Sequence, residues 1–311
     1  MSAASPLVRE WRPDWPCPVG LILVTHRRGR GDPTFRRTPD GTTWRGIRTP
    51  EGTATLRIEP LSSDGVVVAT AWGSGAPWAL DSVPRMLGAY DDPTGFEPPK
   101  VLRDAWRRHQ HWRISATGLV MESLVPTIIE QKVTGMEAFA GFRQLVHRFG
   151  ERAPGPPSEP DPEVRLWIQP SPEELRLIPS WEWLRLHVDG GRSRPVQTVA
   201  RVAKALERAG RESPEEFDRR LRTLPGIGVW TSAEVRSRAL GDPDAVSFGD
   251  YHIAKNVTYA LTGEVGDDDQ MAELLEPWAG HRYRVQRLVE LGGLGRPRHG
   301  ARMAPRTHLP T

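Results

Sequence analysis

The chain has 311 residues, 38% of them hydrophobic and 26% charged, which is typical of a globular protein that buries a sizeable core. Its single cysteine, Cys17, excludes disulfides within the chain and a four-thiolate iron–sulfur cluster. Residues 1–15 are polar and interrupted by prolines, and no apolar run approaches membrane-spanning length, so we expect a cytoplasmic protein that contacts no membrane. A net charge of +3 only weakly favours a polyanionic partner.

Residues 1–98 predict an antiparallel, β-rich subdomain at the N-terminus. Runs rich in β-branched residues alternate there with turn signals such as Pro39-Asp40-Gly41. The predicted strands are residues 19–25, 34–37, 43–47, 54–59 and 66–72. Five arginines lie near the first two of these strands, and we interpret them as solvated hairpin positions, with a nucleic-acid patch as the alternative. They are Arg27, Arg28, Arg30, Arg36 and Arg37.

Helical patterns begin near Pro84 and dominate residues 99–294, which we expect to form a second, mainly α-helical core. Ser171 and Ser213 each begin a Ser-Pro-Glu-Glu capping box, and an amphipathic pattern predicts a helix over residues 198–209. Two segments are too rich in proline or in basic residues to join this core. They are the exposed loop 153–162 and the disordered basic tail 295–311.

The run Leu224–Thr231 predicts a hairpin that binds phosphate. Gly226 and Gly228 let the backbone turn both of their N–H groups outward, and the predicted helix at residues 229–240 adds unsatisfied N-terminal amides. The capped helix that begins at Ser213 precedes the hairpin, so the order is helix, hairpin, helix. Taken alone, a Gly-x-Gly pair is more often an ordinary tight turn.

The hairpin is followed by the segment Gly249-Asp250-Tyr251-His252, which contains Asp250. This order of motifs resembles the helix-hairpin-helix DNA glycosylases, and most closely their 3-methyladenine (alkylated-base) branch. The resemblance covers roughly residues 100–292. The resemblance implies that the hairpin grips the strand carrying a damaged base and that Asp250 is the catalytic carboxylate. A carboxylate suits this chemistry, because breaking an N-glycosidic bond builds positive charge on the sugar. Asp250 can equally serve as the N-cap of the next helix.

The resemblance also implies a sodium or potassium ion held by hairpin carbonyls, which we place at Arg222, Leu224 and Ile227, and no other cofactor is required. Trp230 stands where lyase-type relatives carry a Schiff-base lysine, so we expect base hydrolysis without strand cleavage. The Trp230 indole either stacks on the flipped base or belongs to the core.

In the related branch, the segment equivalent to Glu130-Gln131-Lys132 enters the minor groove and fills the gap left by the flipped nucleotide. Lys132 is poorly suited to a base stack, so Gln131 is the better candidate for filling the gap. The alternatives are a phosphate contact for Lys132 and a loop-tying role for Gln131. With the hairpin, these residues complete the predicted DNA contacts, which are Gln131, Lys132, Gly226, Ile227, Gly228 and Thr231.

Two positions depart from the alkylated-base pattern. Glu234 and Arg287 stand where the resemblance implies aromatic side chains of the base pocket. They either make a polar pocket suited to a neutral or oxidised base, or form a structural salt bridge with each other.

The sequence therefore predicts an α+β protein, with a mainly helical glycosylase core and a β-rich N-terminal subdomain, that acts as a monofunctional DNA glycosylase in base excision repair. We expect a monomer, associated with the nucleoid, that binds double-stranded DNA containing an alkylated or otherwise modified purine. The alternative is a non-catalytic module that uses the hairpin only to grip the DNA backbone.

Overall fold

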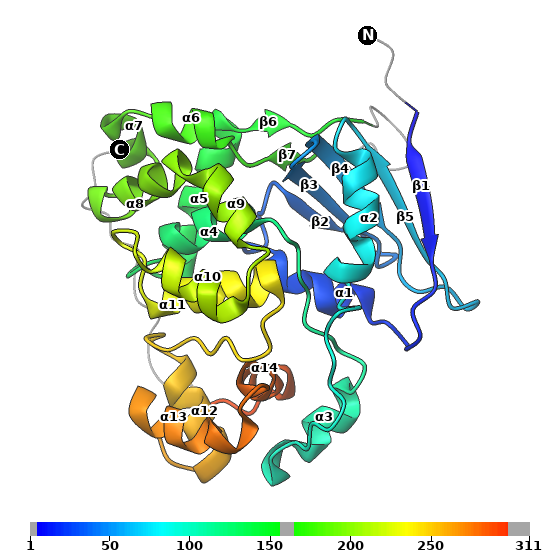
Figure 1. Cartoon of the computed structure of the whole chain (residues 1–311), viewed down its shortest axis with the longest axis vertical. Helices are drawn as coiled ribbons and strands as arrows, with labels where there is room; N and C mark the ends of the chain where they lie inside the picture. Colours follow the sequence, from blue (N-terminus) through cyan, green and yellow to red (C-terminus); the bar gives the residue numbers. More distant parts are fainter. Residues whose placement is uncertain (1–4, 156–164, 298–311) are drawn as a thin grey trace.

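The computed structural model describes residues 5–155 and 165–297, which form a five-stranded sheet, a two-stranded sheet and two groups of helices (Figure 1). Residues 156–162 of the predicted proline-rich loop and 298–311 of the predicted basic tail lie outside the described residues. The strands are β1 (Leu7–Trp11), β2 (Phe35–Arg37), β3 (Thr43–Thr49), β4 (Gly52–Ile58), β5 (Val67–Trp72), β6 (Glu151–Arg152) and β7 (Trp167–Ile168).

The helices follow in chain order. Up to residue 155 they are α1 (Val19–Leu23), η1 (Val24–His26), α2 (Ala76–Met86), η2 (Lys100–Leu102), α3 (Arg103–His109), α4 (Val120–Ile129) and α5 (Gly135–Phe149). After it come α6 (Pro172–Leu177), α7 (Ser180–Arg185), α8 (Gly190–Arg201), α9 (Ala203–Ala209), α10 (Pro214–Leu221), α11 (Val229–Val235), the π-helix η3 (Arg236–Leu240), α12 (Ile253–Thr262), α13 (Asp268–Leu275), η4 (Glu276–Trp278) and α14 (Arg282–Gly292).

A five-stranded antiparallel sheet, in the order β1-β5-β4-β3-β2, confirms the predicted β-rich N-terminal part. The four strands predicted between residues 34 and 72 are present as β2 to β5. The remaining strand, β1, lies at the edge and pairs with β5, with Leu7 opposite Ala71. Leu7 and Val8 are both exposed, so β1 lacks the alternation of buried residues that identifies a strand in a sequence.

The strand predicted at residues 19–25 is wrong. This segment is helix α1 followed by the 3-10 turn η1. Val19, Ile22 and Leu23 are buried at helical spacing and join the cluster of apolar side chains that packs on the sheet. A short apolar run does not distinguish a helix from a buried strand until its packing partners are known.

Helix α2 covers one face of the sheet and packs on β4 and β5 (Figure 1). Its residues Ala79, Val83 and Met86 are buried against the sheet cluster. The helix begins at Ala76, earlier than the predicted onset near Pro84, and Pro84 lies inside it. The predicted boundary near residue 98 falls between α2 and η2, and the division of the chain into subdomains stays a prediction.

Helices α4 to α11 build a second buried cluster, which includes Leu124, Ile128 and Val199. The helix predicted over residues 198–209 is divided in two. Helix α8 ends at Arg201, Val202 has φ −113° and ψ 15°, and α9 begins at the next residue.

Two of the predicted helix starts are observed. Ser171 caps α6 in a full capping box with Glu174. Ser213 caps α10 by accepting the N–H of Glu216, with Pro214 in the first turn. Because these signals are local, they were readable without knowledge of the tertiary packing.

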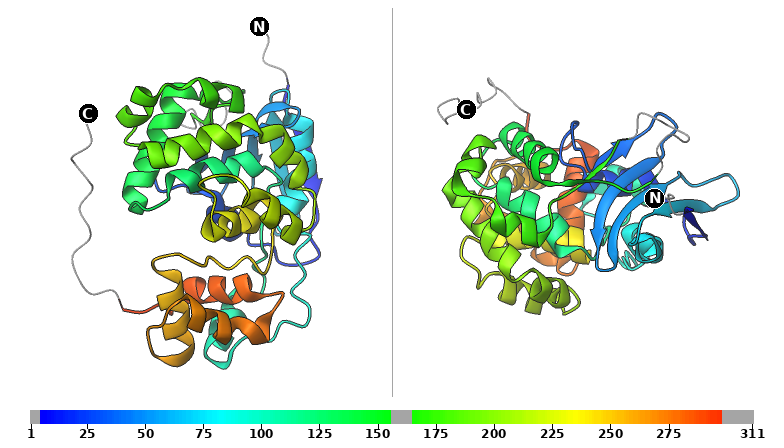
Figure 2. Two further views of the ribbon diagram at one scale, coloured as in Figure 1. Left: turned by 60° about the vertical axis from the view of Figure 1, so that its left-hand side comes forward. Right: turned by 90° about the horizontal axis from the view of Figure 1, so that it is seen from above.

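Helices α3, α12, α13 and α14 form a further group below α10 and α11 in Figure 1, and the turned view in Figure 2 shows the same separation. Their shared cluster contains Met271, Leu275 and Leu288, while Tyr283 of α14 reaches the sheet cluster. Among the described residues, we find no helix with the length and apolar character needed to cross a membrane.

Candidate active site

The predicted hairpin is the loop between α10 and α11. Ile227 donates its N–H to the carbonyl of Leu224 at 3.1 Å, which closes the turn. In the described residues, neither Gly226 nor Gly228 donates its N–H to a backbone acceptor, and both glycines are exposed. These two N–H groups are therefore available to an anion, as a phosphate-binding turn requires.

The two glycines differ in what the fold requires of them. Gly226 has a φ of +84°, in the left-handed region, and a β-carbon there would lie 2.4 Å from Pro195 Cγ. Gly228 has φ −100° and ψ −177°, and a β-carbon there would meet nothing within 4 Å. The fold therefore needs glycine at position 226, whereas the space beside Gly228 is open.

Gln131 joins the turn between α4 and α5 to the hairpin. Its Nε2 donates to the carbonyl of Gly226 at 2.9 Å and to Thr231 Oγ1 at 2.8 Å. These contacts correspond to the alternative role predicted for Gln131, in which its side chain holds a loop in place. Lys132 is exposed and has a φ of +56°, a conformation that residues with a side chain rarely adopt. The structure thus brings Gln131, Gly226 and Thr231 together and leaves Lys132 accessible to solvent.

Asp250 lies just before α12 and beside the first turn of α11. Its Oδ1 accepts the N–H groups of His252 at 2.7 Å and Ile253 at 3.0 Å, which is an N-capping arrangement. Its Oδ2 takes part in no hydrogen bond with the described residues, so one oxygen is fixed and the other is available. A β-carbon at Gly249 would lie 3.8 Å from Trp230 Cβ, which places the Asp250 segment against the start of α11.

Trp230 is half-buried and belongs to none of the three buried clusters. Its Nε1 is shielded from solvent and has no hydrogen-bond partner among the described residues. The core tryptophans Trp112 and Trp183 also have an Nε1 without a hydrogen-bond partner, so this feature does not decide between stacking on a base and a place in the core.

The architecture matches that of solved structures, although no family model and no curated protein matches the sequence. A 3-methyladenine DNA glycosylase from Archaeoglobus fulgidus has a TM-score of 0.74 at 17% identity, covering 91% of this chain and 97% of that one. MBOgg1 in complex with a low-affinity DNA ligand has a TM-score of 0.69 at 15% identity, covering 94% and 96%. An 8-oxoguanine glycosylase/lyase from Clostridium acetobutylicum, in complex with double-stranded DNA, has a TM-score of 0.68 at 10% identity, covering 94% and 98%. The chain has the DNA glycosylase fold. The predicted fold class is therefore confirmed.

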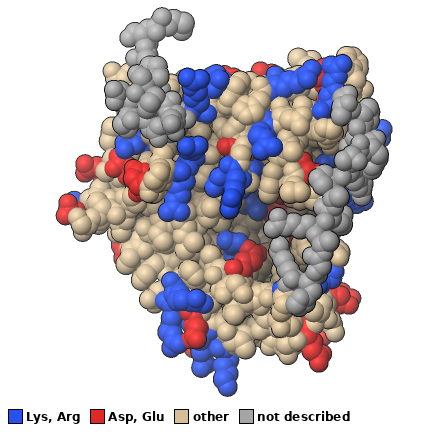
Figure 3. Space-filling model, turned by 180° about the vertical axis from the view of Figure 1, so that it is seen from behind, with Lys and Arg blue, Asp and Glu red and all other residues tan. Residues whose placement is uncertain are grey.

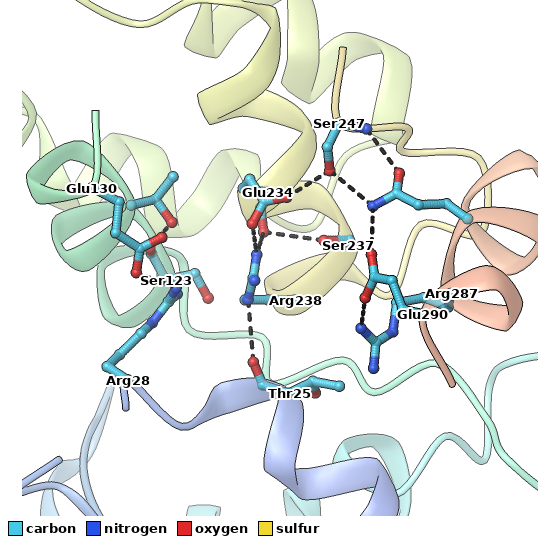
Figure 4. Close-up of polar contacts among 12 residues, drawn as sticks. Thr25, Arg28, Ser123, Glu130, Glu234, Ser237, Arg238, Ser247, Arg287 and Glu290 are labelled. Atoms are coloured by element: carbon cyan, nitrogen blue, oxygen red, sulfur yellow. Dashed lines mark hydrogen bonds and ion pairs between the residues drawn. The ribbon is translucent and has the colours of Figure 1, made fainter. Parts of the chain in front are cut away.

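In this glycosylase fold, the predicted pocket residues Glu234 and Arg287 lie at the two ends of one chain of polar contacts (Figure 4). Ser247 Oγ donates to Glu234 at 2.6 Å and accepts from Gln286 Nε2 at 3.2 Å. Gln286 Nε2 also lies 3.3 Å from an oxygen of Glu290, and the other oxygen of Glu290 pairs with Arg287. Glu234 and Arg287 are thus linked through three residues rather than paired directly.

Arg238 is the ion-pair partner of Glu234, one helical turn further along the chain (Figure 4). Its Nε also donates to the carbonyl of Thr25 at 3.3 Å, which ties η3 to the turn after α1. Burial alone would raise the pKa of Glu234, but the Arg238 guanidinium and the Ser247 hydroxyl outweigh burial and lower it. The Glu–Arg spacing of four residues in a helix was the sequence signal that could have identified this pair.

Arg28 differs from its predicted role as a solvated residue. It is buried and forms an ion pair with Glu130 Oε1 at 2.8 Å (Figure 4), which connects the N-terminal part to the residue before Gln131. Burial lowers the pKa of Arg28, and the Glu130 carboxylate opposes this effect. The two residues are 102 positions apart, so the sequence carries no local signal for the pair. Of the other arginines predicted to be solvated, Arg30, Arg36 and Arg37 are exposed and Arg27 is half-buried.

The predicted cation ligands are three backbone carbonyls of the hairpin. The Leu224 carbonyl accepts one hydrogen bond, from Ile227, and an oxygen of this kind retains a second lone pair. The carbonyls of Arg222 and Ile227 accept no backbone hydrogen bond in the turn. Uncharged oxygen atoms are a donor type that hard cations accept, so a sodium or potassium ion at these three carbonyls stays a prediction.

Proposed function

We propose that this protein is a monofunctional DNA glycosylase that hydrolyses the N-glycosidic bond of a damaged purine in double-stranded DNA. The observation that carries the proposal is Asp250, which follows a glycine that lies against Trp230 at the start of α11 and has one oxygen fixed and the other available. Relatives of the same fold include a 3-methyladenine DNA glycosylase and an 8-oxoguanine glycosylase/lyase, and both names denote removal of a damaged base.

Asp250 would act on a nucleotide flipped out of the duplex. As the bond between base and sugar breaks, the base leaves with the electron pair and the sugar becomes positively charged. The carboxylate stabilises that charge, and Oδ2 takes the proton from the water that attacks the sugar carbon. The two N–H groups bound to Oδ1 hold the carboxylate in one orientation, so no reorientation is needed during the reaction.

The hairpin would bind a phosphate of the same duplex through the N–H groups of Gly226 and Gly228. Gln131 keeps the Gly226 carbonyl in place, and exposed Lys132 adds a positive charge nearby. Seen from behind in Figure 3, the molecule has a hollow near its middle with many Lys and Arg side chains in the half above it. This distribution of charge suits a polyanionic partner.

We expect no nucleophile for strand cleavage at the position where lyase-type relatives carry their Schiff-base lysine. A tryptophan indole cannot form a Schiff base, and Trp230 occupies the relevant position. The sequence contains only four lysines, and the one nearest to Asp250 in sequence, Lys255, has its Nζ 3.8 Å from the centre of the Tyr251 ring. We therefore propose hydrolysis without lyase activity.

The polar contacts favour an uncharged modified purine over a cationic alkylated one. The Glu234 carboxylate is already neutralised by Arg238 and hydrogen-bonded by Ser247, so it offers little attraction to a positive base. Arg287 keeps a buried Nε–H that has no acceptor among the described residues. Such a donor suits an oxygen or ring nitrogen of a neutral base.

A sodium or potassium ion at the carbonyls of Arg222, Leu224 and Ile227 would stiffen the hairpin and contribute positive charge beside the phosphate. If so, replacing both ions with choline at constant ionic strength lowers the affinity for duplex DNA. The same replacement should leave the far-ultraviolet circular dichroism unchanged. An affinity that is indifferent to the cation would exclude this ion.

The test is an excision assay on duplexes that each carry one lesion: 3-methyladenine, 7-methylguanine, hypoxanthine, ethenoadenine or 8-oxoguanine. We expect the wild-type protein to release at least one base, with strand breaks appearing only after alkali and no covalent complex trapped by borohydride. Duplex binding without release of any base would favour the non-catalytic module. A trapped complex would contradict the monofunctional mechanism.

A further inference from the structure

A row of four cationic side chains lies on α8 and α9, outside the predicted lesion site. Arg201 ends α8, Lys204 and Arg208 lie in α9, and Arg211 follows it. All four are exposed. Lys204 and Arg208, four residues apart, lie on one face of α9, while Arg201 precedes the break at Val202 and Arg211 follows the end of α9. We call these residues the α8–α9 basic row.

Within the described residues, no carboxylate forms an ion pair with the basic row, although Glu207 lies close enough to Arg211 for the two charges to attract each other. The two oxygens of Glu207 accept the N–H groups of Val120 and Met121 at 3.0 and 2.9 Å, so this carboxylate caps α4. Glu212 is paired with Arg220 at 2.9 Å. Arg201, Lys204 and Arg208 therefore present positive charges to solvent without an ion-pair partner among the described residues, whereas Glu207 offsets part of the charge of Arg211.

The basic row borders a cavity of about 1210 Å³ that is also lined by Trp78 and Arg85 of α2, opposite α9 in Figure 1. Burial lowers the pKa of Arg85, and the charge of Arg211 lowers it further, so the cations on the two sides of the cavity repel each other. Gln169 lines the same cavity with 8% of its surface exposed, and its Oε1 has no hydrogen-bond partner among the described residues. No residue of the predicted lesion site lines this cavity.

We propose that the α8–α9 basic row binds the sugar-phosphate backbone of a second nucleic-acid segment, in addition to the segment held at the hairpin. At the helical rise, Lys204 and Arg208 lie about 6 Å apart along α9. A DNA strand carries one phosphate per ~3.4 Å of its axis, so this separation is close to that of two phosphate intervals. A linear polyanion matches a linear row of charges better than a single small anion does. The inference goes beyond base removal, and its test does not depend on excision.

The test measures whether one protein molecule holds two duplexes at once. Two short undamaged duplexes, one carrying a donor and one an acceptor fluorophore, are mixed with the full-length chain, and energy transfer is recorded against protein concentration. The row variant neutralises all four cations, as Arg201→Gln, Lys204→Gln, Arg208→Gln and Arg211→Gln. A matched control removes four exposed cations elsewhere, as Arg12→Gln, Lys100→Gln, Arg103→Gln and Arg108→Gln.

We expect energy transfer with the wild-type chain and with the control variant, and loss of transfer with the row variant. The row variant should keep its affinity for a single duplex, and urea unfolding should show that it folds like wild type. No transfer with the wild-type chain would overturn the proposal, as would transfer that persists in the row variant. A row variant that loses affinity for a single duplex would also overturn it, because the row would then belong to the surface that the hairpin uses.

Discussion

Replacing Gly228 with alanine tests the phosphate-binding hairpin without disturbing the fold. Because a β-carbon there meets nothing within 4 Å and the backbone is not left-handed, the free energy of unfolding should stay the same or rise by up to about 1 kcal/mol. The new methyl group would occupy space that a phosphate oxygen needs to reach the Gly228 N–H. Loss of one hydrogen bond to a charged group costs about 1.5–3 kcal/mol, so duplex affinity should fall about 10- to 150-fold.

The assay is fluorescence anisotropy with an undamaged duplex at one fixed salt concentration, combined with urea unfolding. Gly226→Ala is the matched comparison, because its φ of +84° and the 2.4 Å approach to Pro195 Cγ make a side chain there destabilising. Strain of this kind costs about 1–2 kcal/mol before the clash is counted, so Gly226→Ala should lower stability as well as affinity. A Gly228→Ala protein that binds duplex as tightly as wild type would refute the hairpin assignment.

Three further predictions follow from the contacts around the site. Arg238→Leu leaves the buried Glu234 carboxylate without its ion-pair partner. Urea titration should therefore show that the free energy of unfolding falls by about 3–5 kcal/mol, and a fall of less than about 1 kcal/mol would contradict the ion pair. Gln131→Ala removes two hydrogen bonds to the hairpin region, from Gln131 Nε2 to the Gly226 carbonyl and to Thr231. Fluorescence anisotropy should therefore show that damaged and undamaged duplexes bind equally more weakly. A loss of affinity confined to damaged duplexes would instead support gap filling by Gln131. Burial, and then three neighbouring arginines, hold the pKa of His26 well below its usual value of 6.5. The His26 ring is therefore neutral in the folded protein, but below pH 6.5 it gains a proton when the protein unfolds. Stability should therefore fall as the pH drops below about 6.5, by up to about 1.4 kcal/mol per pH unit from this group, and His26→Gln should remove that contribution in urea titrations at stepped pH. An unchanged slope would contradict the neutral His26.

Local signals accounted for most of the secondary structure that the sequence predicted. Runs of β-branched residues between turn signals marked β2 to β5, and Ser171 and Ser213 marked the starts of α6 and α10. The errors arose where packing decides the conformation. Helix α1 is a short apolar run that reads equally well as a strand, and β1 is an exposed edge strand whose backbone is ordered by pairing with β5.

The candidate site likewise combines residues that local sequence patterns indicate with contacts that form only in the folded chain. The hairpin glycines were predicted from their short spacing in the chain and Asp250 from the resemblance to the glycosylases, and their functional roles stay predictions. The ion pair between Arg28 and Glu130 joins positions 102 residues apart, and no local sequence pattern indicates it. The contacts of Gln131 with the hairpin are also long-range, so the sequence could propose gap filling and loop tying but could not choose between them.

The central claim is that Asp250 carries out base hydrolysis, and Asp250→Asn tests it most directly. An asparagine oxygen can still accept the N–H groups of His252 and Ile253, so the cap and the fold should be retained while the negative charge is lost. The measurement is single-turnover base release from a lesion duplex that wild type cleaves, with duplex affinity and urea unfolding recorded for both proteins. We predict release at least about 100-fold slower than wild type, with affinity and stability unchanged. Release at the wild-type rate would show that Asp250 only caps α12 and that the catalytic group lies elsewhere.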